Sequence, residues 1–421
     1  MVKQSVEPAK RNNMPQIKPE VEAFARIKVI GVGGAGKNAV NHMINSKVKG
    51  VEFIAVNTDA QDLHHSLAQK KIHIGKNLTR GLGTGMNPDL AKRAAEETKE
   101  EIQEAIKGAD MVFIACGTGG GTGSGAAPVV AKTAKELGAL TVAVCTKPFT
   151  FEGFQRMKIA EQALDELRKS VDAVIIIPND RLLSTISRDT TAKSAFAMCD
   201  DILKQAVEGI SDLITMPGTI NIDFADVRTV MENAGSALMG IGTAAGEKRA
   251  EEAARLAINS PLLEVSIANA KGVLFSIAGG DDLTMFEIQD AAKVITESID
   301  PNAKVIFGTV HDDRLKKNEL KITVIASGFP ELDGPRMTAP SARQLFQTVP
   351  EQRVETTKSK FFGSLSNNAQ STTPIAPAQE KPIKFEDETK SIPPTQSPEP
   401  VMEDETDDWG SVPAFLRRQK K

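Results

Sequence analysis

A glycine-rich stretch in the first third of the chain constrains the fold most strongly. It reads Gly117-Thr-Gly-Gly-Gly-Thr-Gly-Ser-Gly125, and six of its nine residues are glycine. Without Cβ atoms the backbone can close around a ligand and direct its N–H groups inward. The apolar segment 111–116 before it and a helical pattern over 128–137 after it predict strand, loop and helix, an arrangement that binds anions. The stretch therefore predicts a phosphate site; a loop that only needs tight turns is the structural alternative.

The composition narrows the possible partners. The 421 residues are enough for two domains with tails, and 51 basic against 55 acidic residues leave no basic excess for nucleic acid. There is no tyrosine, and the single tryptophan, Trp409, lies near the C-terminus. Stacking platforms for single-stranded nucleic acid are therefore not expected.

The cysteines and histidines predict neither a disulfide framework nor a metal site. Cys116, Cys145 and Cys199 are odd in number and far apart, which suits a reducing compartment, and the five histidines show no ligand spacing. The N-terminus does not resemble a signal peptide, and no run reaches the ~20 apolar residues of a membrane span. We expect a soluble cytoplasmic protein without a transmembrane segment.

Between residues 27 and 190, apolar strands alternate with helices. The expected strands are 27–32, 51–57, 111–116, 140–146 and 171–177, and the expected helices are 37–45, 88–107, 128–137 and 154–169. Continuous apolar strands separated by helices are typical of a mostly parallel sheet covered on both faces. We therefore expect a Rossmann-like α/β domain here.

A long central helix over 191–216 leads into a smaller α/β domain at 217–330. Its expected strands are 236–243, 273–278, 304–310 and 321–327, and its expected helices start at 224, 247 and 284. Residues 1–26 are polar and predict a flexible N-terminal tail, and the proline-rich segment 331–404 predicts a disordered linker. Residues 405–421 combine an acidic run, Trp409 and a basic end, which is typical of a short partner-binding peptide.

The first glycine loop allows three interpretations. Gly31-Val-Gly-Gly-Ala-Gly36 matches GxGxxG, and Asp59 follows the next strand, as in NAD-binding domains. With Lys37 it also matches GxxxxGK, but Asn38 replaces the Ser/Thr that binds Mg²⁺ in a P-loop. Two more glycine loops, 81–85 and 117–125, favour a triphosphate over one pyrophosphate. An NAD-dependent oxidoreductase remains the alternative.

Several motifs resemble those of the tubulin/FtsZ family of GTPases. Gly119-Gly-Gly-Thr-Gly-Ser-Gly125 is similar to the tubulin-type signature GGGTGSG. The other similar segments are 31–41, 57–61, 148–153, 179–181 and 221–226. The resemblance covers 27–329 and resumes at 409–418. This chain departs from the common pattern at Lys37, at Thr84, where alanine is frequent, and at Val412.

The resemblance implies GTP or GDP as the ligand, with Mg²⁺ accompanying it. The residues it assigns to the phosphates are Gly34, Ala35, Gly36, Lys37, Asn38, Gly121, Thr122 and Gly123, and the loop 81–85 closes over the terminal phosphate. Lys37 is an addition that could touch a phosphate directly. No protein metal ligands are implied.

The same resemblance assigns the rest of the nucleotide. Glu152 and Arg156 hold the ribose and a phosphate, although their spacing alone predicts a surface ion pair. Asn179 and Asp200 recognise guanine, and Phe196 is available to stack on it. Without the resemblance, Asp200 would be an ordinary solvated helix carboxylate.

The catalytic residues implied are Asp223 and Asp226, which orient and polarise the attacking water, and Asn221, which helps to position their loop. From sequence alone, an N-cap followed by an acidic residue is the alternative. A helix over 191–216 is roughly 39 Å long, so a subunit whose helix starts near guanine cannot bring both aspartates to its own nucleotide. Head-to-tail association with a second copy is therefore expected.

The resemblance implies a polymerising GTPase of the septal ring in bacterial cell division. Its C-terminal peptide, Trp409–Arg418, would bind membrane-tethering division proteins at the inner face of the membrane. A filament scaffold that binds GTP without turnover is the second alternative.

Overall fold

The computed structural model describes residues 25–183, 189–216, 218–260, 263, 266–312 and 314–329. The expected linker and partner-binding peptide, and nearly all of the expected N-terminal tail, lie outside the described residues. Among the residues described, no helix combines the length and apolarity needed to cross a membrane.

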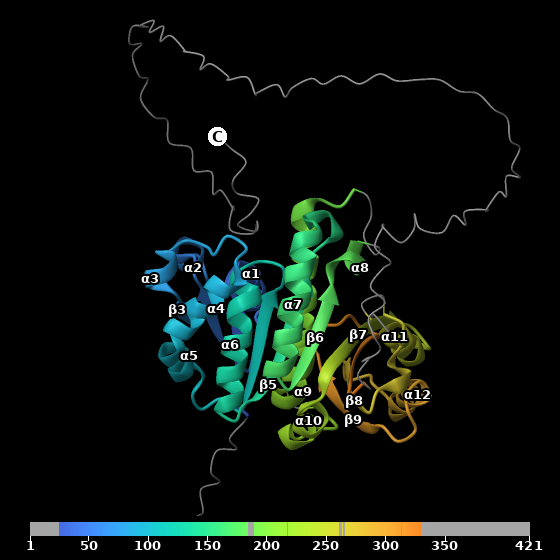
Figure 1. The fold of residues 1–421 in the computed structure, drawn as a ribbon. Coiled ribbons are helices and arrows are strands. Elements are labelled where there is room, and N and C mark those ends of the chain that lie inside the picture. The colour runs from blue at the N-terminus through green and yellow to red at the C-terminus, as the bar shows by residue number, and fades with distance from the viewer. Residues whose placement is uncertain are drawn as a thin grey trace, which may run out of the picture. The chain divides into compact units, whose positions relative to one another are not determined.

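Ten strands form the central sheet, in the order β3-β2-β1-β4-β5-β6-β7-β10-β8-β9. The first six run parallel, and they are β1 (Ile27–Val32), β2 (Val51–Asn57), β3 (Lys70–His73), β4 (Met111–Gly117), β5 (Leu140–Lys147) and β6 (Ala173–Pro178). The order of the strands reverses beside β1, because β2 lies on one side of it and β4 on the other. The expected parallel sheet is confirmed (Figure 1).

Helices cover both faces of this parallel part. On one face pack α4 (Pro88–Glu97), α5 (Lys99–Ile106), α6 (Thr122–Glu136) and α7 (Phe154–Ser170). On the other pack α1 (Gly33–Asn45), α9 (Ala192–Thr215) and α10 (Phe224–Met231). Side chains alternate between the two cores along each strand, so that Val29 contacts one and Ile30 the other. Three short helices, α2 (Ala60–His64), α3 (Lys76–Thr79) and α8 (Asn179–Leu183), lie in the connections.

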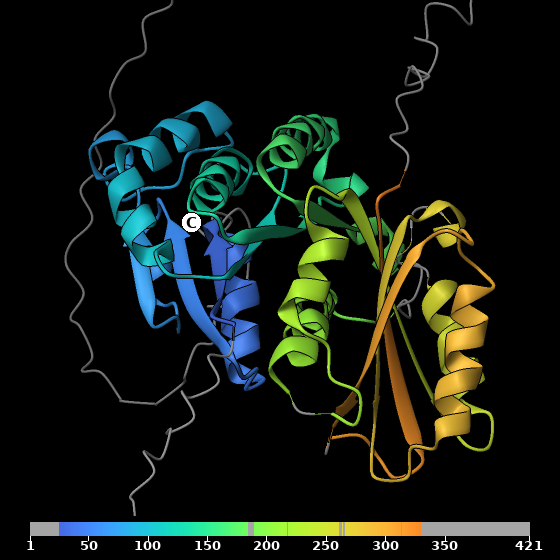
Figure 2. The ribbon, with the colours of Figure 1, turned by 90° about the horizontal axis from the view of Figure 1, so that it is seen from below.

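The second half of the chain extends the same sheet. Its strands are β7 (Gly235–Ala245), β8 (Gly272–Gly279), β9 (Lys304–His311) and β10 (Glu319–Ser327). β7 pairs in parallel with β6, and β10 is antiparallel to both of its neighbours. The helices α11 (Arg249–Ile258) and α12 (Met285–Thr296) cover one face. Figure 2 shows the yellow-green α9 between the blue-to-teal and the yellow-to-orange halves of the sheet.

Three expectations about the elements need correction. The helix expected over 88–107 is two helices that meet at Thr98, whose hydroxyl donates to the Ala94 carbonyl and whose oxygen accepts from the Gly75 N–H. The helices expected from residues 37 and 128 begin earlier, at Gly33 and Thr122. The short elements β3, α2, α3 and α8 were not expected, because four or five residues carry little periodic signal.

Candidate functional site

A cavity of about 730 Å³ lies where the parallel strands end. Its wall includes residues at or just beyond the carboxyl ends of four strands, namely Val32, Gly117, Thr146 and Asn179. β1 and β4 stand at the point where the strand order reverses, and in open α/β sheets such a point is where ligands bind. The topology therefore places a ligand site at this edge.

Two helices begin at the cavity without a side-chain cap. α1 follows Val32 and α6 follows Gly121, and neither has an acidic residue in its first turn. By contrast, side chains cap α4 at Asn87, α9 at Thr191 and α10 at Asp223. The unpaired N–H groups and helix dipoles of α1 and α6 therefore favour an anion in the cavity.

The predicted phosphate-binding residues divide into two groups. Six of them line the cavity, namely Gly34, Ala35, Asn38, Gly121, Thr122 and Gly123, together with Gly83 and Gly85 of the second glycine loop. Gly36 and Lys37 are not part of the wall. A Cβ on Gly36 would lie 2.3 Å from the Ala115 carbonyl oxygen, so this glycine lets α1 pack against β4.

Lys37 is the largest fully buried side chain among the described residues, at 1% exposure. Its Nζ lies 3.0 Å from Oδ1 of Asp62, and Oδ2 of Asp62 accepts a hydrogen bond of 2.9 Å from the Asn57 amide. Lys37, for which the sequence left a direct contact with a phosphate open, thus lies in a buried pair and outside the cavity wall. Lys37 instead neutralises Asp62, which does line the cavity.

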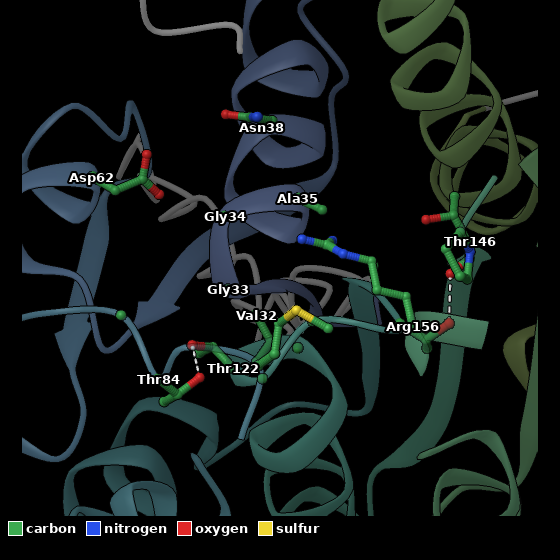
Figure 3. Close-up of a pocket in the computed structure, with 18 of the residues that line it drawn as sticks. Val32, Gly33, Gly34, Ala35, Asn38, Asp62, Thr84, Thr122, Thr146 and Arg156 are labelled. Atoms are coloured by element: carbon green, nitrogen blue, oxygen red, sulfur yellow. Dashed lines mark hydrogen bonds between the residues drawn. The ribbon is translucent and has the colours of Figure 1, made fainter. Parts of the chain in front are cut away.

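Three threonine hydroxyls meet beside the start of α6, and we call them the threonine cluster: Thr58, Thr84 and Thr122. Thr122 Oγ1 lies 2.9 Å from Thr58 Oγ1 and 3.4 Å from Thr84 Oγ1, as Figure 3 shows for the second pair. Ser124 has a different role, because its hydroxyl accepts a 2.9 Å hydrogen bond from the Gly119 N–H. Ser124 therefore stabilises the glycine loop through a hydrogen bond with its backbone.

Glu152 and Arg156 form the ion pair that their spacing predicts, with 3.1 Å between Oε2 and Nη1. The pair is not a surface pair, because the two side chains are 8% and 18% exposed and both line the cavity. Glu152 is held from its other oxygen by the Phe149 N–H at 3.0 Å. Figure 3 shows Arg156 extending toward Ala35 at the start of α1.

Asn179, Phe196 and Asp200 line the end of the cavity next to β6 and α9. Oδ1 of Asn179 is buried and has no hydrogen-bond partner in the described chain. Burial raises the pKa of Asp200 to about 7, although the positive charge of Lys37 opposes the shift. An orphaned amide oxygen and a desolvated carboxylate together suit a ligand that carries N–H donors.

The predicted catalytic residues lie elsewhere. Asp223, Asp226 and Asn221 are not part of the cavity wall. Asp223 is the N-cap of α10 and accepts from the Ala225 N–H at 2.8 Å, and Asn221 accepts from the Gly218 N–H at 2.7 Å. The N-cap alternative is thus confirmed for Asp223. Both aspartates are exposed to solvent.

The central helix separates these aspartates from the cavity. α9 touches the cavity at its first half, through Leu203 among others, and continues to Thr215. At 1.5 Å per residue, Thr215 lies about 18 Å further along the helix, and Asp223 follows it in the chain.

Sequence reasoning missed Asp62 and the roles of the threonine hydroxyls. A buried lysine requires a carboxylate partner, but the sequence does not show that Lys37 is buried, so it carries no clear signal for Asp62. No group of three or more His, Cys, Asp or Glu suited to a metal ion occurs within the part of the chain that the structure describes. A Mg²⁺ ion here would therefore depend chiefly on phosphate oxygens and water, which is common for this ion.

Comparison with protein families gives two matches. The model of the tubulin/FtsZ family GTPase domain matches residues 26–187, and that of the FtsZ family C-terminal domain matches residues 235–330. The first match contains the cavity residues up to Asn179, and the second begins at β7.

Solved structures agree with these matches. FtsZ from M. jannaschii, in a structure described as an empty dimer, is 47% identical, with a TM-score of 0.69 over 72% of this chain and 88% of that chain. A point mutant of the same protein, also 47% identical, gives 0.70 over 73% and 92%. CetZ2 from Haloferax volcanii, described as a GTPγS-bound protofilament, is 23% identical and shares the fold, with 0.61 over 73% and 94%.

Proposed function

Because this chain belongs to the tubulin/FtsZ family of GTPases, we propose that it binds GTP in the cavity and hydrolyses it after head-to-tail assembly with further copies. The single observation that carries the assembly step is the distance between the two predicted halves of the active site. The cavity can bind, but the exposed pair Asp223 and Asp226 stands apart from it, beyond α9.

The uncapped first turns of α1 and α6 bind the phosphates through Gly34, Ala35, Thr122 and Gly123. Arg156 adds a positive charge, and Glu152 holds Arg156 while facing the ribose. Backbone N–H groups suit this task because they carry no net charge and need not be desolvated at great cost. Mg²⁺ enters with the nucleotide and neutralises part of the phosphate charge.

Asp200 and Asn179 select guanine. The Asp200 carboxylate accepts from the two N–H positions on the guanine edge, which adenine does not present in that pattern. A ligand without those donors would leave a buried carboxylate unpaired, and sites built in this way discriminate by roughly 10⁴-fold or more. The orphaned Asn179 oxygen provides a further acceptor at the same end.

Hydrolysis needs a positioned water molecule. The exposed carboxylates of the next subunit act as the base for this water and orient it. Asp223 is fixed as the N-cap of α10, which holds Asp226 in the first turn of the same helix. Asn221 braces the loop through Gly218. The carboxylates accept hydrogen bonds from the attacking water and direct its oxygen toward the terminal phosphorus.

A contact between the cavity face of one copy and the α10 end of another is heterologous, so repetition gives an open filament. The terminal phosphate lies at that contact, and its loss is expected to weaken the filament.

We further propose that these filaments act in cell division at the cytoplasmic face of the division site, forming the septal ring if the source is a bacterium. Trp409–Arg418 would bind membrane-tethering proteins there, and the linker 331–404 would act as a flexible spacer.

Domain boundaries form part of the same proposal. Residues 27–190 bind GTP, 191–216 form the central helix, and 217–330 carry the catalytic loop. The N-terminal tail 1–26 and the peptide 405–421 complete the division of the chain.

The shared site is tested by mixing two inactive variants. Asp226→Ala keeps the cavity but lacks a catalytic carboxylate, and Asp200→Ala keeps the carboxylates but binds guanine poorly. In a mixed filament, GTP held by the first variant meets the intact loop of the second. Phosphate release from the mixture should therefore exceed the sum of the separate rates.

Wild-type turnover per subunit should also fall steeply on dilution, together with light scattering. An unchanged rate down to nanomolar protein, or no gain on mixing, would contradict hydrolysis at a subunit contact. GDP and ATP in place of GTP serve as the nucleotide controls. Equal binding of GTP and ATP would contradict the assignment of Asp200.

A further inference from the structure

We propose that the side-chain hydroxyl of Thr84 donates a hydrogen bond to the terminal phosphate of GTP and so makes the cavity prefer the triphosphate over GDP. The inference rests on the proposed function of the cavity as a guanine nucleotide site. It concerns the threonine cluster, whose side-chain hydroxyls that proposal does not use.

The three hydroxyls of the cluster carry more hydrogens than their mutual contacts use. Thr58, Thr84 and Thr122 each carry one hydroxyl hydrogen, and two contacts join the three oxygens. Neither Thr58, Thr84 nor Thr122 makes another side-chain hydrogen bond within the described ranges of the chain. At least one hydroxyl hydrogen is therefore left for a partner outside the cluster.

Burial decides which hydroxyl holds that hydrogen. Thr58 is 0% exposed and is not part of the cavity wall, so its hydrogen is best used on Thr122 at 2.9 Å. Thr122 then donates to Thr84, and Thr84 ends the chain with its own hydrogen free. Thr84 lines the cavity, and its 3.4 Å contact with Thr122 is longer than an ordinary O–H···O bond.

The strand order places Thr84 at the end of the nucleotide away from the base. Asn179 follows β6, the phosphate-binding first turns of α6 and α1 follow β4 and β1, and Thr58 follows β2. From β6 to β2 there are four strand spacings, or about 19 Å. A nucleotide whose guanine lies at Asn179 thus extends its phosphates across β4 and β1 toward the threonine cluster.

Backbone contacts fix the loop that carries Thr84 against the start of α6. A Cβ on Gly121 would lie 2.0 Å from Thr84 Oγ1, so the hydroxyl sits directly over the glycine that precedes α6. The Gly81 carbonyl accepts from the Ala60 N–H at 3.0 Å, and the Thr84 carbonyl accepts from the Asn87 N–H at 3.2 Å. Thr84 is 7% exposed, whereas Leu82 in the same loop is 69% exposed.

The row of threonine hydroxyls also suits a negatively charged acceptor. A terminal phosphate is anionic, and hydrogen bonds to charged groups are stronger than neutral ones. In a row of hydroxyls, each donor polarises the next, so Thr58 and Thr122 strengthen the donor at Thr84. GDP lacks the phosphate that would reach this position and gains nothing from it.

The test compares Thr84→Val, which removes the hydroxyl and keeps the shape, with Thr84→Ser, which keeps the hydroxyl. Binding of GDP and of a non-hydrolysable GTP analogue is measured by competition against a fluorescent guanine nucleotide. Thr84→Val should bind the analogue about tenfold or more weakly, the usual effect of one hydrogen bond to a charged group. Its GDP affinity should stay within about twofold, and Thr84→Ser should resemble the wild type.

Thr58→Val is the matched control, since it removes a cluster hydroxyl that does not face the cavity. Because Thr58 only polarises the donor at Thr84, this variant should weaken analogue binding less than Thr84→Val does and should leave GDP binding within about twofold. Equal losses of GDP and analogue binding in Thr84→Val would show that Thr84 only shapes the loop, and unchanged binding of both would show that the hydroxyl does not reach the phosphate. Failure of the wild type to bind either nucleotide would instead contradict the proposed function.

Discussion

Asp200 is a half-buried carboxylate that lines the cavity. Burial raises its pKa to about 7, and Lys37, whose ammonium is paired with Asp62, opposes that shift. Without a ligand the carboxyl group is therefore divided between its neutral and charged forms near neutral pH. Guanine N–H groups can bond only to the charged form in the proposed geometry, so binding and deprotonation are linked.

Affinity for guanine nucleotides should accordingly fall as the pH drops below 7, approaching a tenfold loss per pH unit. Above pH 8 the group is charged and the affinity should be constant. The measurement is nucleotide binding between pH 5.5 and 8.5 for the wild type and Asp200→Asn. The variant should bind weakly, and its profile reports the titration of the nucleotide itself. Parallel profiles for the two proteins would contradict the role of Asp200.

Motif spacing at the residue scale predicted the cavity wall well and the side-chain environments poorly. Asn179 and Asp200, which the resemblance assigned to guanine, both line the cavity. Lys37 lies in a buried ion pair with Asp62, and a lysine after a glycine loop suits such a pair as well as a phosphate contact, so that only packing decides between them. The raised pKa of Asp200 could not be predicted, since it depends on burial by side chains distant in sequence.

At the scale of elements, the glycines do more than free the backbone to approach a ligand. Gly36 lets α1 contact β4, and Gly125 lets α6 contact α4, because a Cβ on Gly125 would lie 2.0 Å from the Pro88 carbonyl oxygen. Gly120, in the same stretch, has no atom within 4 Å of its Cβ position. The glycine signature thus contains packing positions as well as binding positions.

Gly125→Ala should lower the free energy of unfolding by about 1–3 kcal/mol or more, because backbone atoms must move to admit the methyl group. Gly120→Ala is the matched control and should change stability by less than about 0.5 kcal/mol. Urea unfolding without nucleotide provides both values. Equal stability of the two variants would show that α4 and α6 can separate without strain.

Glycine also explains why the element boundaries were predicted less well than their order. A helix is not expected to begin inside a glycine-rich loop, since glycine is a poor helix former, yet α1 begins at Gly33 and α6 at Thr122. Close packing holds these helices in place, because Gly36 and Gly125 let α1 and α6 lie directly against β4 and α4. Strands with continuous apolar sequence, such as β4 and β5, were predicted to within one residue at each end.

At the scale of the whole molecule, α9 and the continuous sheet join the two halves. The pairing of β6 with β7 was not expected from the sequence, because strand neighbours far apart in the chain leave no local signal. A second link is ionic. Arg314, in the loop between β9 and β10, contacts Glu208 of α9 at 2.6 Å and Asp312 through two nitrogens at 2.8 and 3.0 Å.

Removing Arg314 should weaken this link. The Glu208 side chain is 5% exposed and would keep a buried charge without its partner, whereas Arg314 itself is 56% exposed, so we expect Arg314→Met to cost about 1–3 kcal/mol in the free energy of unfolding. Adding Glu208→Gln should recover part of that loss, because the buried charge is then removed as well. The measurement is urea unfolding of the single and double variants.

The loss should also depend on pH. Burial, followed by the charge of Glu208, raises the pKa of Asp212 to about 7, and Arg314 opposes that shift. As the pH rises through 7, Asp212 becomes charged in the folded protein and depends more on Arg314. The deficit of Arg314→Met should therefore be larger at pH 8 than at pH 6.

Arg255→Met is the control, since its 2.7 Å pair with Glu251 is exposed and should contribute less than about 0.5 kcal/mol at either pH. Equal deficits for the two arginine variants would show that the ionic link adds nothing to the joining of the two halves.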